Sequence, residues 1–199
     1  VFFSETMNAS VKLFGSVALA LIALLPLVFD FVIDARYNEA YVYIPILLVG
    51  AFFHAITGLY SAIYIAKKLT KQIANTTLIS ASISIVLNLL LIHFIGVYGA
   101  AISMAIAYFS LAVYRHFDVK KYVTITYQKG IFMVLLAFLS LTILLYYFNN
   151  PIGNIVNIIV VGTFGLIFNH SIIRIIKTKV LAIARRKPVF LGQTDENIL

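Results

Sequence analysis

Hydroxyl and amide side chains recur at every fourth position within one apolar stretch of this sequence. Residues four apart lie on the same face of an α-helix, so these side chains would form one polar stripe. Such a stripe could line a hydrophilic passage and hydrogen-bond sugar hydroxyls, or it could pack one helix against another. Both interpretations stay open at this point. The stripe consists of Thr76, Ser80, Ser84 and Asn88.

A histidine, His54, lies between Gly50 and Gly58 in a second apolar stretch. If that stretch crosses a membrane, the imidazole lies near the midplane of the bilayer. An ionisable group at that depth is costly when charged, so it usually faces the bundle interior and stays neutral or finds a partner. We therefore predict that His54 makes a polar contact inside the membrane. The alternative is a neutral histidine that packs between the glycines and bonds a neighbouring carbonyl.

A group of cations lies where three of the apolar stretches end. Ammonium and guanidinium groups pair well with phosphate oxygens, so this group could hold a pyrophosphate headgroup that arrives from the inner leaflet. Membrane topology alone also demands positive charge on one side, which is the alternative explanation. The group consists of Lys67, Lys68, Lys71 and Arg115.

No constellation of catalytic or metal-binding residues stands out. The sequence has no cysteine, and His93 and His170 lack a second ligand at metal-binding spacing. His116 and Asp118 are two positions apart, so on a helix they point to different faces. Paired carboxylates, a glycine-rich phosphate loop and a nucleophile elbow are missing as well. We therefore expect no enzyme, no metal site and no cofactor.

The elements that position these residues are six apolar stretches. The chain of 199 residues is 62% hydrophobic and 11% charged, which leaves too little polar surface for a water-soluble globule. About 20 residues of helix span the roughly 30 Å hydrocarbon layer. We predict an all-α fold, a polytopic transmembrane bundle of six helices over residues 13–33, 41–66, 73–95, 99–117, 130–148 and 152–176.

Positive charge indicates how the bundle is oriented. If residue 1 is cytoplasmic, all of the 15 lysines and arginines except Arg36 lie at or beyond cytoplasmic helix ends, as the positive-inside rule requires. We therefore predict that both termini of this segment are cytoplasmic. This topology also explains the net charge of +8, so we expect no nucleic-acid partner.

The pattern of stretches and charges predicts five parts, and the first residue is not methionine. We expect the sequence to be the C-terminal portion of a longer protein. The parts are a cytoplasmic connection over 1–12, a four-helix unit over 13–117, a cytoplasmic loop over 118–129, two further transmembrane helices over 130–176, and a basic and polar cytoplasmic tail over 177–199.

Short motifs within the four-helix unit resemble a known family. They are YNEA at 37–40, IPILLVG at 44–50, NLLLI at 88–92, and GVYGAAI at 96–102. Over roughly residues 12–118 they are similar to the C-terminal region of bacterial polysaccharide flippases, the Wzx-type transporters of O-antigen and capsule repeat units. These belong to the multidrug/oligosaccharidyl-lipid/polysaccharide exporter superfamily. Where such proteins often have proline after the asparagine helix, this chain has His93.

The resemblance implies the C-terminal lobe of a two-lobed, MATE-like transporter of the bacterial inner membrane. Relatives move undecaprenyl-pyrophosphate-linked oligosaccharides from the cytoplasmic to the periplasmic leaflet by alternating access, in cell-surface polysaccharide biosynthesis. The implied partners are this lipid-linked oligosaccharide, the lipid bilayer and the missing N-terminal lobe. On this hypothesis His54 and the polar stripe face the passage, and the four cations hold the headgroup phosphate at its cytoplasmic mouth.

Two alternatives stay open. A cation-coupled multidrug exporter of the same superfamily should carry a carboxylate deep in an apolar helix, whereas Asp30 lies close to the outer end of its stretch and no other embedded acid is predicted. A membrane-bound glycosyl- or acyltransferase should place acids or histidines in pairs at one membrane face, and this sequence has no such pairs.

Overall fold

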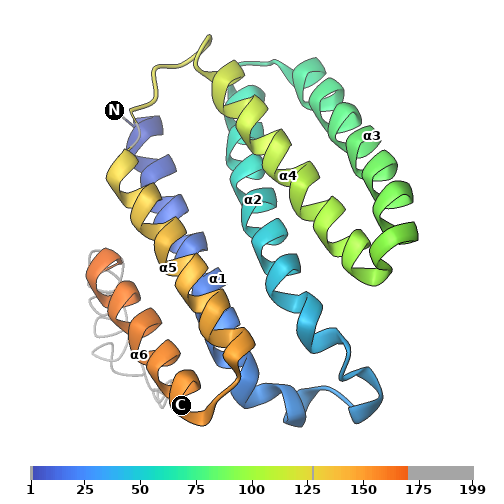
Figure 1. Cartoon of the computed structure of the whole chain (residues 1–199). Helices are drawn as coiled ribbons and strands as arrows, with labels where there is room; N and C mark the ends of the chain where they lie inside the picture. The colour runs from blue at the N-terminus through green and yellow to red at the C-terminus, as the bar shows by residue number, and fades with distance from the viewer. Residues whose placement is uncertain (1, 127, 170–199) are drawn as a thin grey trace, which may run out of the picture.

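The computed structural model describes residues 2–126 and 128–169, and this part of the chain is all α-helical. Each of its six long helices is long and apolar enough to cross a membrane, so the predicted polytopic bundle is confirmed. A short 3-10 helix, η1 (Ala35–Tyr37), follows the first of them. The six are α1 (Phe2–Val32), α2 (Ala40–Ala66), α3 (Thr70–Ile95), α4 (Val97–Val119), α5 (Lys129–Phe148) and α6 (Pro151–Phe168) (Figure 1).

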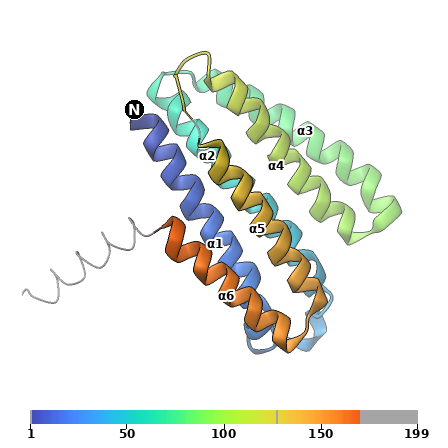
Figure 2. The ribbon, with the colours of Figure 1, turned by 60° about the vertical axis from the view of Figure 1, so that its left-hand side comes forward.

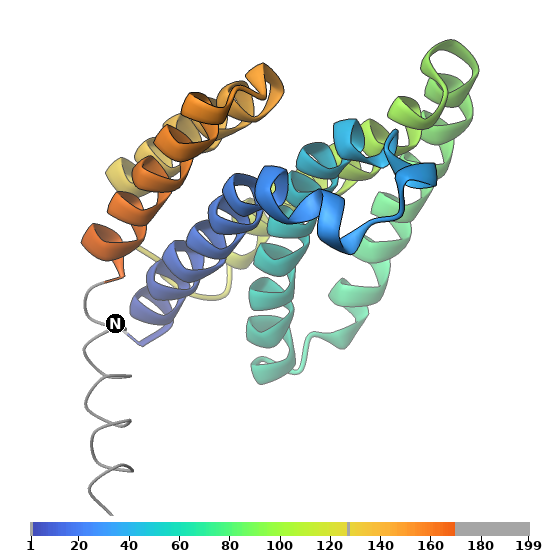
Figure 3. The ribbon, with the colours of Figure 1, turned by 90° about the horizontal axis from the view of Figure 1, so that it is seen from below.

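The helices form two groups of three. α4 packs along both α2 and α3, while α5 and α6 pack on each other and on α1. Contacts between α1 and α2 join the two groups (Figure 3). α1 packs on α2 as well as on α5 and α6, and the predicted unit 13–117 stays a prediction. Gly15 permits this arrangement, because a Cβ atom there would lie 2.1 Å from Leu135 Cδ1 of α5.

α1 begins at Phe2, well before the predicted start of the first span at residue 13. Residues 2–12 contain neither proline nor glycine to stop a helix. Met7 is buried, and the Asn8 side chain bonds the next connection: its Nδ2 donates to Thr126 O at 3.0 Å and its Oδ1 accepts from Gln128 N at 3.2 Å. The polar residues of 2–12 therefore belong to the first turns of α1, which bond the α4–α5 connection.

Two tight turns join α3 to α4 and α5 to α6. Gly96 joins α3 to α4 with a φ of +56°, a conformation that favours glycine. Gly99 lets the two helices meet, since a Cβ atom there would lie 2.4 Å from the Leu91 carbonyl carbon. Asn149 ends α5 in the left-handed region, and Pro151 opens α6 at a position where a missing N–H costs nothing.

The connections that contain lysines lie at one end of the bundle, and the other connections lie towards the opposite end (Figure 1). The beginning of α1, the α2–α3 connection at 67–69 and the α4–α5 connection at 120–128 lie at one end (Figures 1 and 2). η1 and the two tight turns lie towards the other. Residues predicted to share the cytoplasmic side therefore share an end, and the orientation itself stays a prediction. The end of the sixth span, 170–176, and the tail 177–199 lie outside the described residues.

Candidate functional site

A cavity of about 440 Å³ lies among α2, α3 and α4, and we call it the polar cavity. Of the predicted site residues, His54, Ser80, Ser84 and Arg115 line it together. They come from three consecutive helices, α2, α3 and α4. Apolar wall is supplied by Ala81, Ile85, Met104, Ala107 and Leu111, and further polar wall by Thr57, Ser61, Thr77 and Tyr108.

Arg115 is the most constrained residue of the polar cavity. It lies about one turn before the end of α4, and only 2% of it is exposed. Its guanidinium makes six hydrogen bonds, all to oxygens of α2 and α3, so it ties three helices together. Nε donates to Thr76 Oγ1 at 3.0 Å, Nη1 to Thr57 O at 3.0 Å and Ser61 Oγ at 2.6 Å, and Nη2 to Thr76 Oγ1 at 2.9 Å, Thr77 Oγ1 at 3.0 Å and Ile73 O at 3.3 Å.

The four cations that the sequence analysis grouped have different surroundings. Lys67 and Lys68 form the exposed reversal between α2 and α3, and Lys71 is exposed in the first turn of α3. Lys68 has a φ of 59°, as the tight reversal requires. None of the three lines the polar cavity, whereas Arg115 is buried beside it. Topology accounts for the exposed lysines, and the buried arginine needs a separate explanation.

The stripe on α3 divides along its length. Thr76 and Ser80 are buried, and they bond neighbouring helices: Thr76 accepts from Arg115, and Ser80 Oγ donates to Ala107 O at 3.1 Å. Ser84 is half-buried and lines the polar cavity with Ser80. Asn88 is half-buried and lies outside the cavity wall. The beginning of the stripe therefore packs helices, and its middle faces the cavity.

His54 presents its ring to the polar cavity. The imidazole lies 4.5 Å, centroid to centroid, from the ring of Tyr108 on α4. Among the described residues its ring nitrogens have no hydrogen-bond partner. Its own backbone oxygen accepts the Thr57 hydroxyl at 2.7 Å. Gly50, one turn earlier, lets α4 approach, because a Cβ atom there would lie 3.3 Å from the Ala105 Cα.

Sequence reasoning missed the hydroxyls of α2 that complete the site. Thr57 and Ser61 are four apart and follow His54 on the same side of the helix, so their spacing is the signal used for α3. Thr77 was missed because it stands one position after a residue of the stripe. Tyr108 belongs to α4, and only the fold brings its ring to His54.

Asp118 is a buried carboxylate where the sequence analysis placed the start of a cytoplasmic loop. It belongs to α4 and is 5% exposed. Tyr64 Oη donates to its Oδ2 at 2.7 Å, and Lys121 Nζ donates to its Oδ1 at 3.0 Å. This hydrogen bond and the charge of Asp118 raise the pKa of Lys121. The carboxylate is therefore paired with a lysine at the end of α4.

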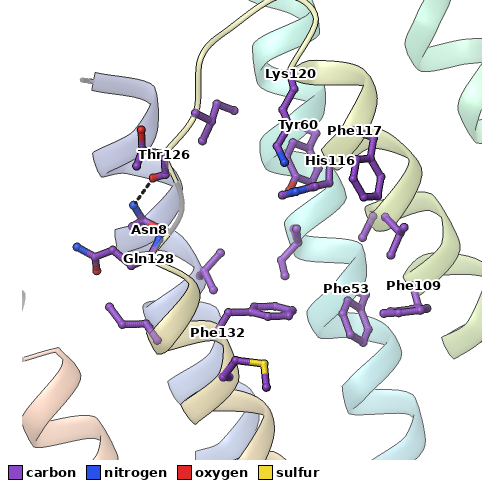
Figure 4. A pocket seen from close by; sticks show the side chains of 17 residues that line it. Asn8, Phe53, Tyr60, Phe109, His116, Phe117, Lys120, Thr126, Gln128 and Phe132 are labelled. Carbon is purple, nitrogen blue, oxygen red and sulfur yellow. Dashed lines mark hydrogen bonds between the residues drawn. The ribbon is translucent and has the colours of Figure 1, made fainter.

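A second hollow, of about 750 Å³, lies on the opposite side of the α2–α4 pair, facing α1 and α5. We call it the lateral groove. Its wall is largely apolar, with Phe53, Phe109 and Phe132 pointing into it (Figure 4). Polar groups lie at its rim, where Tyr60 Oη and His116 Nδ1 are 3.2 Å apart. Asn8, Lys120, Thr126 and Gln128 complete the rim (Figure 4).

Comparisons of this chain with protein-family models, with curated proteins and with solved structures find no match. The six helices that are long and apolar enough to cross a membrane make the molecule a polytopic helical membrane protein, and the resemblance to flippases stays a prediction. Within the described ranges 2–126 and 128–169, no group of three or more histidine and carboxylate side chains is placed to hold a metal ion.

Proposed function

We propose that this chain is part of a flippase of the bacterial inner membrane. It would move an undecaprenyl-pyrophosphate-linked oligosaccharide from the cytoplasmic to the periplasmic leaflet by alternating access, together with an N-terminal lobe. The observation that carries the proposal is the polar cavity among α2, α3 and α4. A sugar head cannot cross hydrocarbon unaided, and polar side chains inside membrane helices mark the paths of polar substrates.

The cavity has the size and chemistry that a sugar needs. Its volume of about 440 Å³ falls in the range of about 300–1,000 Å³ that is typical of small-molecule sites. Ser84, Thr77 and Tyr108 offer hydroxyl groups, and the rings of His54 and Tyr108, tilted by 51° to each other, offer faces against which a sugar ring can pack. Ala81, Ile85, Met104, Ala107 and Leu111 form the apolar part of the wall.

The surroundings of the cavity suit a lobe that works with a second one. Of α3, only Thr76 and Ser80 are buried among the described residues, so most of this helix is left to lipid or to another lobe. Lys67, Lys68 and Lys71 lie exposed at the predicted cytoplasmic end, where they would attract the pyrophosphate of the carrier.

A leucine in the cavity tests the proposal. In the full-length protein, Ser84→Leu fills part of the cavity and removes a hydroxyl, so we expect a loss of most surface polysaccharide, measured by immunoblot of whole-cell extracts. Ser82→Leu is the matched control, because Ser82 is exposed on α3 outside the cavity wall. Unchanged polysaccharide in the Ser84→Leu strain, at a normal level of the protein in the membrane, would contradict the proposal.

A further inference from the structure

Arg115 brings a positive charge to the polar cavity, and no carboxylate is among the described residues that line it. Among the described residues the ion pairs are Arg36 with Asp34 and Lys121 with Asp118. The hydrogen bonds of Arg115 all end on neutral oxygens. A guanidinium stays charged in proteins, and a buried charge is costly until an opposite charge balances it. The described residues of the cavity wall therefore supply no negative charge to balance the guanidinium of Arg115.

The hydroxyl of Thr77 directs this charge into the cavity. Thr77 Oγ1 accepts a hydrogen bond from Arg115 Nη2 at 3.0 Å, so its own proton must point elsewhere. In the described part of the chain no protein acceptor takes that proton, and Thr77 lines the cavity. The Ser61 hydroxyl differs, because it also accepts from Arg115 but donates to Thr57 O at 3.0 Å. Thr77 is thus a donor that a cation polarises.

The rest of the polar wall is also rich in hydrogen-bond donors that have no partner. The hydroxyls of Ser84 and Tyr108 and the ring of His54 line the cavity without a protein partner in residues 2–126 and 128–169. No carboxylate belongs to this part of the wall. Spare donors beside an unbalanced cation are complementary to an oxygen atom that carries negative charge.

We propose that the polar cavity binds an anionic oxygen group, a carboxylate or a phosphate, that is attached to the sugar of the transported molecule. The anion lies at the Arg115 end of the cavity and accepts the Thr77 hydroxyl, with the sugar ring towards His54 and Tyr108. That the bound molecule is then transported rests on the proposed function, whereas the binding itself can be measured alone. The group can come from an acidic sugar or from the phosphate next to the sugar.

Protection of a single cysteine tests the proposal. The sequence has no cysteine, so Ser84→Cys places one thiol in the cavity of the full-length protein, once any cysteine elsewhere is replaced by serine. The rate of maleimide labelling in detergent is measured with glucuronate, glucose 1-phosphate or glucose. Because hydrogen bonds to charged groups are the strong ones, one charged sugar should protect at a concentration about tenfold below that of glucose. The more effective one identifies the source of the anion.

Two variants tie the protection to the charge. Arg115→Gln should abolish the advantage of the charged sugar over glucose. If that variant does not fold, Thr77→Val keeps the charge and loses the donor, and it should weaken protection by the charged sugar about threefold or more. Thr163→Val is the matched control, because the Thr163 hydroxyl is exposed and bonds Ile159 O in its own helix. Ser82→Cys, outside the cavity, should show no protection by any sugar.

The outcomes separate this inference from the proposed function. Glucose protecting as well as both charged sugars, no protection at all, or unchanged protection in Thr77→Val would each overturn the anion site. Normal surface polysaccharide in the Ser84→Leu strain would overturn the transport proposal and leave the anion site standing.

Discussion

The α2–α4 pair separates two hollows of opposite character. Residues that follow one another along α2 face opposite sides: Phe53 lines the lateral groove and His54 the polar cavity, and Tyr60 and Ser61 divide in the same way. α4 alternates likewise, with Phe109 next to Tyr108 and His116 next to Arg115. One pair of membrane helices can therefore offer apolar wall on one side and hydrogen-bond donors on the other.

The two hollows differ in how strongly they fix the structure. Lipid chains are as apolar as the wall of the lateral groove. Lipid can therefore fill the groove at little cost in free energy, and the groove places little constraint on how the helices pack. The polar cavity has charged and hydroxylated groups that must find partners, because hydrocarbon supplies none. Changes on the cavity side of the α2–α4 pair should therefore cost more stability than changes on the groove side.

Arg115→Met should have the largest effect. Methionine keeps an unbranched apolar stem but makes none of the six hydrogen bonds that join α4 to α2 and α3. We expect the free energy of unfolding, measured by titration with denaturing detergent, to fall by about 2–4 kcal/mol.

Lys121→Met is the matched control for this loss of a cation from the same end of the bundle. The Lys121 side chain is 70% exposed, and its partner Asp118 keeps the hydrogen bond from Tyr64. Exposed ion pairs contribute little, so this variant should stay close to the parent protein. Equal effects of the two variants would show that the guanidinium does not hold the three helices together.

Gly99→Ala should have the second largest effect, since Gly99 sets the distance between α3 and α4. The added methyl group would lie 2.4 Å from the Leu91 carbonyl carbon, and backbone cannot yield as a side chain can. We expect a loss of about 1–3 kcal/mol in the unfolding free energy and a change in the labelling rate of a cysteine at position 84.

Gly162→Ala is the control for glycine replacement in a helix. Nothing lies within 4 Å of a Cβ atom at Gly162, so the only effect is the better helix propensity of alanine, a gain of about 0.5–1 kcal/mol. If Gly99→Ala behaved in the same way, the close contact between α3 and α4 would not determine the cavity.

The sequence predicted the elements of the cavity side well because the signals there are local. Apolar length predicted the helices, and four-residue spacing placed Ser80 and Ser84 on one face. His54 lines the polar cavity but is exposed, so the expectation that it faces the bundle interior stays a prediction.

Other features depend on packing that the sequence does not reveal. Arg115 has the same local signal as the exposed lysines, a cation near a helix end, and only its position on α4 buries it against α2 and α3. The first turns of α1 contain polar residues because Asn8 bonds the 120–128 connection, a partner more than 100 positions away. The lateral groove has no sequence signal, since its wall has the composition of a lipid-facing surface.

Phe109→Leu on the groove side should have the smallest effect of the three. Phe109 is 48% exposed, and its ring meets Phe53 edge to face at 5.0 Å. Leucine loses that aromatic contact, worth about 0.5–1 kcal/mol, and lipid chains fill the space that the ring leaves. The unfolding free energy should fall by no more than this amount, and the labelling of a cysteine at position 84 should stay at its parent rate. A loss as large as that of Arg115→Met would show that the groove, as much as the cavity, fixes the arrangement of α2 and α4.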